Sequence, residues 1–241
     1  MKVIILCGGK GTRLGFETKI MPKPMVKIDS DPILYHIINY YMKFGYKDFI
    51  IALGYKGKII SKYLKKKFKY KINLKCINTG LNTLTGTRLL KLHKYLKNEN
   101  NFMLTYGDGL TNQNLSKLKT FHIKNKKTAT MTVVRPPVRF GEVKLKQKLI
   151  TNFKEKPQIK NSWINGGFFV FNKKIFKYLN KKKNEMLEKS PLEKLSTNKQ
   201  LLAFKHHGFW QCMDTPRDKE FIKELIRRKK APWLKKNRET Y

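Results

Sequence analysis

The sequence Lys2-Val3-Ile4-Ile5-Leu6-Cys7-Gly8-Gly9-Lys10-Gly11-Thr12-Arg13-Leu14 joins an apolar run to a glycine-rich loop. The run from Val3 to Cys7 is typical of a buried strand. Glycine allows left-handed backbone angles and close approach to a ligand, and successive N–H groups in such a turn form an anion-binding concavity. Lys10 and Arg13 add positive charge, and arginine can bind phosphate in a bidentate manner. The stretch therefore predicts a phosphate-binding loop after the first strand of an α/β sheet.

This loop differs from two common phosphate-binding motifs. A dinucleotide-binding fingerprint needs a third glycine where Leu14 stands, and a Walker A loop ends in Gly-Lys-Ser/Thr, which is absent. Instead, Gly-Gly-x-Gly-Thr-Arg-Leu is followed by Pro22-Lys23-Pro24-Met25. This pair of motifs resembles the sugar-nucleotide pyrophosphorylases, nucleotidyltransferases that join a nucleoside triphosphate to a sugar 1-phosphate. A tight glycine turn with solvated charges is the alternative, and the second motif makes it the weaker one.

The rest of the chain alternates between strand-like and helix-like stretches, without repeats or low-complexity linkers. Further strands are expected at 49–53, 72–77, 102–106 and 131–135, with a basic strand pair at 140–153 and an aromatic strand late in the stretch 163–171. Asp31 is expected to cap a helix that starts at Pro32, and Asn165-Gly166-Gly167 to form a turn that leads into an aromatic strand. The alternation predicts an α/β fold with a mainly parallel sheet.

The composition suits a single globular domain in a reducing compartment. The chain has 241 residues, of which 40% are hydrophobic, which suffices for a real core. Three cysteines without a CxxC pair argue against a disulfide framework or a zinc site. No apolar run reaches the length of a membrane span, and the apolar start is too short for a signal peptide. We expect a cytoplasmic protein.

The formal net charge of +38 allows two interpretations. It could indicate a polyanionic partner, such as nucleic acid, an anionic membrane surface or phosphorylated substrates. It could also reflect compositional drift, because lysine, asparagine, isoleucine, phenylalanine and tyrosine have AT-rich codons and the lysines are spread along the chain. We favour drift, and expect neither a nucleic-acid nor a membrane partner.

Two aspartates are candidate metal ligands. Asp108 stands between glycines directly after the apolar stretch 102–106, and the carboxyl end of a core strand is where open α/β sheets place ligands. A simple Asp-Gly turn or a helix cap is the alternative. Asp214 precedes Thr215-Pro216, so it could equally be a helix N-cap.

Further motifs extend the resemblance over nearly the whole chain, and together they are similar to the cytidylyltransferase branch of the family. They are Leu53-Gly54-Tyr55-Lys56-Gly57, Thr79-Gly80, Thr85-Gly86-Thr87-Arg88-Leu89, Tyr106-Gly107-Asp108-Gly109, Arg139-Phe140-Gly141, Glu155-Lys156-Pro157, Asn165-Gly166-Gly167-Phe168-Phe169-Val170, Trp210-Gln211-x-Met213-Asp214-Thr215 and Ala231-Pro232-Trp233. That branch makes CDP-glucose for the deoxysugars of bacterial surface polysaccharides such as the O-antigen of lipopolysaccharide. The resemblance implies a Rossmann-like nucleotide-diphospho-sugar transferase fold with a small β lobe that binds the sugar. It also implies one domain over 1–241, with a nucleotide-binding half (1–110) and a sugar-phosphate-binding half (111–241).

The resemblance also implies roles for individual residues. The implied catalytic residues are Arg13, which would neutralise pyrophosphate, Lys23 beside the α-phosphate, and Asp108 and Asp214, which would share Mg²⁺. The implied nucleotide-binding residues are Leu6, Gly8, Gly9, Lys10, Gly11, Thr12, Arg13, Lys23, Thr79, Gly80, Arg88 and Asp108. The implied sugar-phosphate-binding residues are Gly141, Glu155, Lys156, Asn165 and Gly166.

The implied reaction is Mg²⁺-dependent transfer of a cytidylyl group from CTP to glucose 1-phosphate, giving CDP-glucose and pyrophosphate, by a homo-oligomeric enzyme. Two departures from the branch bear on specificity and assembly: the segment from Lys62 to Ile77 is short, and Asn78 replaces an acidic residue. A uridylyl- or thymidylyltransferase, or another hexose 1-phosphate, therefore stays open. So do a catalytically silent basic protein that binds nucleotides or nucleic acid, and a regulatory subunit that binds nucleotide without turnover.

Overall fold

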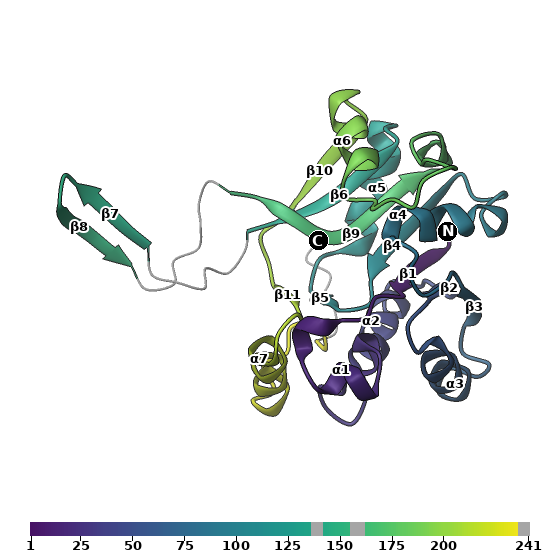
Figure 1. Ribbon diagram of the computed structural model, residues 1–241, viewed down its shortest axis with the longest axis horizontal. Helices are drawn as coiled ribbons and strands as arrows, with labels where there is room; N and C mark the ends of the chain where they lie inside the picture. The colour runs from purple at the N-terminus through teal and green to yellow at the C-terminus, as the bar shows by residue number, and fades with distance from the viewer. Residues whose placement is uncertain (136–141, 155–161, 236–241) are drawn as a thin grey trace.

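A seven-stranded sheet forms the centre of the molecule (Figure 1). The computed structural model describes residues 1–135, 142–154 and 162–235. The strand order is β10-β6-β9-β4-β1-β2-β3. Their bounds are β1 Val3–Cys7, β2 Asp48–Leu53, β3 Asn73–Asn78, β4 Asn101–Tyr106, β6 Ala129–Val134, β9 Ile164–Asn172 and β10 Leu201–His206. Adjacent strands pair in parallel except at β9, which is antiparallel to both β4 and β6. The predicted mixed, mainly parallel sheet is confirmed.

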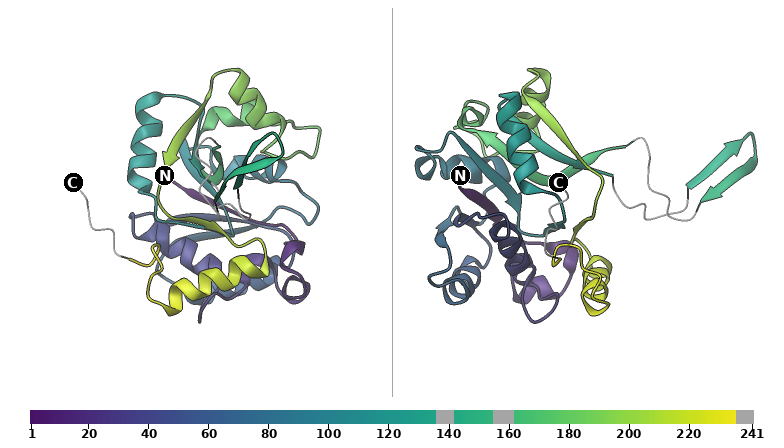
Figure 2. Two further views of the ribbon diagram at one scale, coloured as in Figure 1. Left: turned by 90° about the vertical axis from the view of Figure 1, so that its left-hand side faces the viewer. Right: turned by 180° about the vertical axis from the view of Figure 1, so that it is seen from behind.

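Helices cover both faces of this sheet, because strands buried on two sides expose apolar side chains to two cores (Figure 2). One core holds Ile5 of β1 and the apolar side chains of α2 (Ile33–Met42), α3 (Gly57–Lys67), α5 (Leu115–Asn125) and α7 (Pro216–Arg227). The other holds Ile4 and those of α4 (Thr85–Lys91), α6 (Ser190–Thr197) and the 3-10 helix η4 (Lys173–Lys177). Short helical turns complete the connections: α1 (Glu17–Ile20), η1 (Thr12–Leu14), η2 (Lys23–Met25) and η3 (His93–Tyr95).

Two small antiparallel sheets lie outside the central one. β5 (Gly109–Thr111) pairs with β11 (Trp210–Cys212), and this pair borders the site described below. β7 (Glu142–Lys146) pairs with β8 (Leu149–Lys154) in a hairpin that stands apart from the main body in Figure 1. This hairpin occupies the stretch where the basic strand pair was predicted.

The start of α2 differs from the prediction. Pro32 is the N-cap residue, and no side chain caps this helix. The Asp31 carboxylate instead accepts hydrogen bonds from the Tyr63 hydroxyl at 2.6 Å and from Lys67 Nζ at 3.0 Å. A contact to α3 has thus replaced the local cap, so the prediction that Asp31 caps a helix beginning at Pro32 is wrong.

The stretch Asn165-Gly166-Gly167 is also different from the predicted turn. It lies inside β9, where the register against β6 shifts between Met131 and Val133. Gly167 has φ +76°, and a Cβ there would lie 2.6 Å from Cδ2 of Tyr106. The glycine therefore serves an irregular strand that passes close to an aromatic ring.

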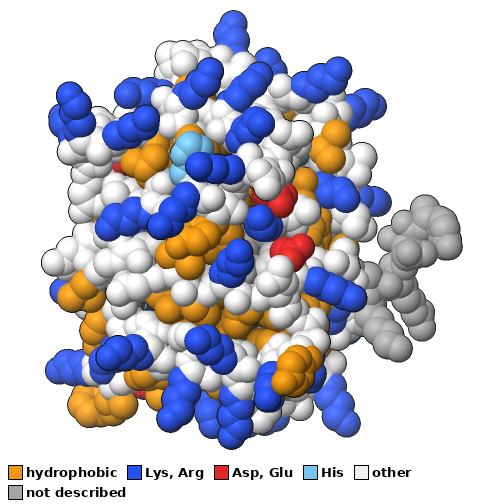
Figure 3. Space-filling model, turned by 90° about the vertical axis from the view of Figure 1, so that its right-hand side faces the viewer, with side chains coloured by type: hydrophobic (Ala, Val, Ile, Leu, Met, Phe, Trp, Pro, Cys, Tyr) orange, Lys and Arg blue, Asp and Glu red, His pale blue; other side chains and the backbone are white. Residues whose placement is uncertain are grey.

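The surface shows basic side chains dispersed over the face drawn in Figure 3 rather than gathered into one patch. None of the helices in the described part of the chain has the length and apolar composition needed to cross a bilayer.

Candidate active site

A cavity of about 700 Å³ opens where β1 and β4 end. Its size is typical of small-molecule sites, which span roughly 300–1,000 Å³. The glycine loop after β1, the turn after β4 and the glycines of β9 all line it. Parallel strands end at the same sheet edge, and so the residues that follow them converge.

The glycine loop is held by a buried arginine. The Arg88 side chain comes from α4, and the residue is only 3% exposed. Its Nη2 donates to the Gly8 carbonyl at 3.0 Å, and its Nη1 donates to the Leu53 carbonyl at 3.0 Å and to Thr79 Oγ1 at 2.5 Å. A Cβ on Gly8 would overlap the guanidinium. Gly8 is therefore a glycine because Arg88 packs against it.

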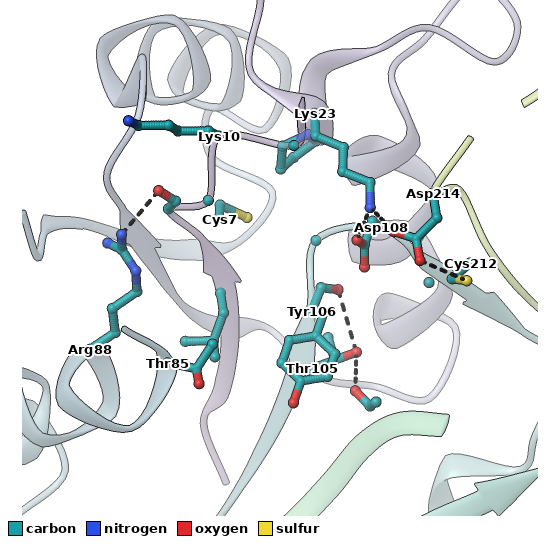
Figure 4. Close-up of a pocket in the computed structure, with 18 of the residues that line it drawn as sticks. Cys7, Lys10, Lys23, Thr85, Arg88, Thr105, Tyr106, Asp108, Cys212 and Asp214 are labelled. Atoms are coloured by element: carbon teal, nitrogen blue, oxygen red, sulfur yellow. Dashed lines mark hydrogen bonds and ion pairs between the residues drawn. The ribbon is translucent and has the colours of Figure 1, made fainter. Parts of the chain in front are cut away.

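Lys23 lies between two carboxylates (Figure 4). Its Nζ is 2.5 Å from Oδ2 of Asp108 and 2.5 Å from Oδ1 of Asp214. Arg13 Nη1 lies 3.1 Å from the other oxygen of Asp214. Gly11 has φ +68°, and a Cβ there would be 2.7 Å from Cβ of Lys23, so the loop packs directly on this lysine. Two cations and two anions thus meet beside the glycine loop.

The two aspartates are 106 positions apart and are brought together by the small β5–β11 sheet. Cys212 pairs with Gly109 in this ladder, and the Met213 N–H donates to the Asp108 carbonyl at 2.9 Å. Asp108 does occupy the turn between β4 and β5. The carboxylate nevertheless faces the cavity, so the turn and the site are compatible.

Asp214 is not the cap of the helix that follows it. Thr215 is the N-cap of α7 and forms a capping box with Asp218. Because Thr215 satisfies the helix end, the Asp214 carboxylate is free to turn towards Lys23 and Arg13.

The electrostatics of this cluster favour its charged form. Burial acts to raise the pKa of Asp214, but hydrogen bonding to Lys23 and the charges of Lys23 and Arg13 outweigh it and lower that pKa. Burial likewise acts to lower the pKa of Lys23, and the two carboxylates, Asp108 first, raise it instead. Lys23 and Asp214 therefore each favour the charged form.

The loop that carries Arg13 is held by contacts of the residues 17–20 that follow it. The Tyr55 hydroxyl donates to the Thr18 carbonyl at 3.0 Å, and Lys56 Nζ donates to the Ile20 carbonyl at 2.8 Å. Lys219 of α7 forms an ion pair with Glu17 at 2.6 Å. The Gly-Tyr-Lys-Gly motif after β2 thus contributes by holding this loop.

On the β9 side, the cavity is lined by Asn165 and Gly166. The Trp210 indole N–H donates to the Gly166 carbonyl at 2.7 Å, and Asn165 Oδ1 accepts the Gly167 N–H at 2.8 Å. Gly141, Glu155 and Lys156, the other predicted sugar-phosphate ligands, lie outside the described residues.

The structure brings most of the predicted nucleotide ligands to the cavity wall. Those that line it are Leu6, Gly8, Gly9, Lys10, Gly11, Arg13, Lys23, Arg88 and Asp108. Thr12 and Gly80 are not among the lining residues, and Thr79, 1% exposed, is buried with its hydroxyl donating to the Leu53 carbonyl. Arg88 lines the cavity while both terminal nitrogens of its guanidinium bind protein oxygens.

Sequence reasoning missed a second set of lining residues, among them the loop 81–85 and Met186. The loop connects two motifs of the sequence, Thr79-Gly80 and Thr85-Gly86-Thr87-Arg88-Leu89. No neighbouring residue in the sequence predicted that Met186, about a hundred positions later, would line the cavity beside this loop.

Comparison with known proteins decides the family. The family described as Nucleotidyl transferase matches residues 2–218. The chain belongs to the nucleotidyl transferase family. This nucleotidyltransferase is 39% identical over 254 aligned residues to the glucose-1-phosphate cytidylyltransferase of Salmonella typhimurium, with 97% of this chain and 98% of that protein covered. It is 36% identical to a D-glycero-alpha-D-manno-heptose 1-phosphate guanylyltransferase of Campylobacter jejuni, over 73% and 78% of the two chains.

Solved structures share the fold of this nucleotidyltransferase. A UDP-glucose pyrophosphorylase complexed with UDP-glucose superposes with a TM-score of 0.74 at 17% identity, covering 95% of this chain and 98% of that one. HddC from Yersinia pseudotuberculosis gives a TM-score of 0.73 at 24% identity, covering 93% and 99%. The predicted fold class is confirmed.

Proposed function

We propose that the protein transfers a cytidylyl group from CTP to glucose 1-phosphate, releasing pyrophosphate and CDP-glucose. The observation that carries the proposal is the cluster in which Lys23 contacts Asp108 and Asp214 beside the glycine loop. The choice of CTP and glucose 1-phosphate rests on similarity to the Salmonella glucose-1-phosphate cytidylyltransferase over almost the whole of both chains.

The reaction needs one bond to form and one to break. An oxygen of the sugar 1-phosphate attacks the α-phosphorus of CTP in line, and the bond from that phosphorus to the oxygen bridging the β-phosphate breaks. The bonding electrons leave with pyrophosphate. Catalysis of this kind depends mainly on positioning and on stabilisation of the developing charge.

The residues at the cavity suit these tasks. The N–H groups of the glycine loop would hold the triphosphate, Lys23 would contact the α-phosphate, and Arg13 would neutralise the departing pyrophosphate. Arg13 is well placed to move, because its side chain is 73% exposed. Asn165 and Gly166 would contact the sugar phosphate, together with Gly141, Glu155 and Lys156.

The two aspartates fit a divalent cation. Lys23 Nζ lies 2.5 Å from an oxygen of each carboxylate, so a single cationic centre can contact both. Mg²⁺ typically binds one or two carboxylates and completes its shell with phosphate oxygens and water. When bound by Asp108 and Asp214, it would supply Lewis-acid stabilisation of charge on the phosphates.

We retain as proposals the division into a nucleotide-binding half (1–110) and a sugar-phosphate-binding half (111–241), a cytoplasmic location and a homo-oligomeric state. The cavity draws on both halves of the chain, since Gly8 lies in the first and Asp214 in the second.

The test is an assay of pyrophosphate release from purified protein with Mg²⁺, CTP and glucose 1-phosphate, in which CDP-glucose is identified by chromatography. The proposal predicts equal amounts of both products and their loss in Asp214→Asn. Pyrophosphate release without CDP-glucose would show hydrolysis instead of transfer and would contradict the proposal.

A further inference from the structure

The end of the cavity farthest from the ion cluster has an apolar lining. Figure 4 shows Thr85 and Arg88 on the opposite side of the cavity from Asp108 and Asp214. Leu81, Leu84 and Met186 line the cavity, with exposed fractions of 51%, 41% and 37%. Three exposed apolar side chains therefore border a cavity whose other end is built to hold phosphate.

A single amide side chain fixes the loop 81–84. Asn184 Oδ1 accepts the Leu84 N–H at 2.9 Å, and Asn184 Nδ2 donates to the Asn82 carbonyl at 2.8 Å. Asn184 thus binds the backbone on both sides of Thr83. The loop's shape is consequently set by a residue about a hundred positions later in the chain.

The residues after Asn184 continue this contact along the start of α4. The Gly86 N–H donates to the Glu185 carbonyl at 3.0 Å, and the Leu187 N–H donates to Thr85 Oγ1 at 2.8 Å. A Cβ on Gly86 would lie 3.0 Å from that same Glu185 carbonyl oxygen, so the two backbones are closely packed. Met186 is carried between these two anchored residues.

Glu188 links the same segment to the strand that leads to Asp108. One carboxylate oxygen accepts from the Thr85 hydroxyl at 2.5 Å, and the other accepts from the Tyr106 hydroxyl. Tyr106 is the last residue of β4. Glu188 therefore connects the segment that carries Met186 to the strand that leads into the turn of Asp108.

We propose that the segment from Asn184 to Glu188 forms a wall of the nucleobase site, with Met186 packed on the base face and Asn184 holding the loop whose Asn82 meets the base edge. This inference rests on the proposed function. A base has two apolar π faces and a polar edge, which match a thioether with apolar neighbours and an amide that both donates and accepts. Once phosphates occupy the glycine loop, this apolar end is where the base reaches.

The first experiment tests Met186 by nucleotide binding and steady-state kinetics. Met186→Ala is expected to raise both the Kd and the KM for CTP by about threefold to tenfold, through lost apolar contact, with the effect in KM rather than in kcat. Met186→Ala should weaken the binding of CTP and of UTP equally, because a contact with the face of a base does not distinguish the polar groups on its edge. Met186→Leu, which keeps the volume, recovers most of the affinity. Ile59→Ala removes another apolar side chain, 41% exposed on α3, and is the matched control.

The second experiment tests Asn184 as a positioning residue. Asn184→Ala releases the loop, so we expect the ratio of kcat/KM for CTP to that for UTP to fall by about threefold or more. Asn184→Asp keeps the acceptor for the Leu84 N–H but loses the donor to the Asn82 carbonyl. Its ratio of kcat/KM for CTP to that for UTP should therefore lie between the ratios of wild type and Asn184→Ala. A merely structural role would lower the melting temperature without changing this ratio.

The outcomes separate the inference from the function on which it rests. If the wild type releases no pyrophosphate with any nucleotide, the proposed function fails. If the wild type is active but Met186→Ala binds CTP as tightly as Ile59→Ala does, the nucleobase wall is disproved while the function stands. An unchanged selectivity ratio in folded Asn184→Ala would overturn the role of Asn184.

Discussion

Nζ of Lys23 lies 2.5 Å from Oδ2 of Asp108, and the same ammonium contacts Asp214 at the same distance. The lysine is only 8% exposed, so its charge is directed at the two acids rather than at solvent. One cation thus joins the turn after β4 to the connection between β11 and α7. The glycine loop, the two acids and the glycines of β9 line the same cavity around this contact.

Removing Asp108 should impair chemistry far more than binding. We expect Asp108→Ala to lower kcat by about 100-fold or more, because its carboxylate would hold the cation that stabilises charge developing on the phosphates. Calorimetry should show the CTP affinity changed by less than about threefold. Glu220→Gln, which alters an acid whose side chain is 65% exposed on α7, is the control. A folded Asp108→Ala enzyme with full turnover at saturating Mg²⁺ would refute the metal assignment.

Replacing Lys23 should have opposite effects on catalysis and on metal binding. In Lys23→Met the two carboxylates lose their shared cation, so we expect Mn²⁺ to bind the nucleotide-free protein about tenfold more tightly, as measured by electron paramagnetic resonance. The kcat should fall, since the α-phosphate loses its positive partner. Lys19→Met, an exposed lysine of α1, serves as the control. Equal Mn²⁺ affinity in Lys23→Met and wild type would count against this account of the cluster.

Arg88 should matter for stability as well as for nucleotide binding. Arg88→Ala removes three buried charged hydrogen bonds, to the carbonyls of Gly8 and Leu53 and to Thr79 Oγ1. The Tyr55 N–H still donates to Gly8, and Thr79 still donates to Leu53. We expect a loss of about 3 kcal/mol in the free energy of unfolding, together with a higher KM for CTP as the glycine loop loosens. Arg88→Lys should recover little, because an ammonium lacks the fork of the guanidinium. Urea unfolding, with exposed Arg217→Ala as control, measures the loss, and no measurable change would contradict the role of Arg88.

His122 should make the protein sensitive to mild acid. It is 2% exposed, and its ring contacts Thr130 Oγ1 at 2.9 Å and Asn101 Oδ1 at 3.2 Å. Burial lowers its pKa to about 4. In the unfolded chain the histidine pKa is about 6.5, so the unfolded state binds more protons between these two pH values. The free energy of unfolding therefore falls by about 3 kcal/mol in all as the pH falls through this window.

The test compares urea unfolding of wild type and His122→Gln at about pH 7.5 and about pH 4.5. At the higher pH, the variant is expected to have a lower free energy of unfolding than wild type. On acidification, its free energy of unfolding should fall by about 2–3 kcal/mol less than that of wild type. His207→Gln, an exposed histidine, should keep the wild-type pH dependence. The same acid loss in His122→Gln as in wild type would rule out this cause.

The local features of the fold could be predicted because their causes are local. The apolar run from Val3 to Cys7 ends at glycines, so the first strand and the loop after it are unambiguous. The helix of residues 33–42 follows from apolar spacing. Its start was mispredicted because Asp31 binds Tyr63 and Lys67 from another helix, and such a contact leaves no trace in neighbouring residues.

The site itself was only partly predictable. Asp108 and Asp214 could be chosen from motifs, but their convergence depends on pairing between two three-residue strands, which are too short to show periodicity. The contact of Asn184 with Asn82 and Leu84 also joins distant segments through backbone groups, whose positions no side-chain pattern encodes. Both features arise from tertiary packing.

The most direct test of the central claim compares CTP, UTP, dTTP and ATP as substrates with glucose 1-phosphate and Mg²⁺, using pyrophosphate release by the purified protein. We predict the highest kcat/KM with CTP and formation of CDP-glucose. A clear preference for another triphosphate would contradict cytidylyl transfer while leaving the fold and the phosphate chemistry in place.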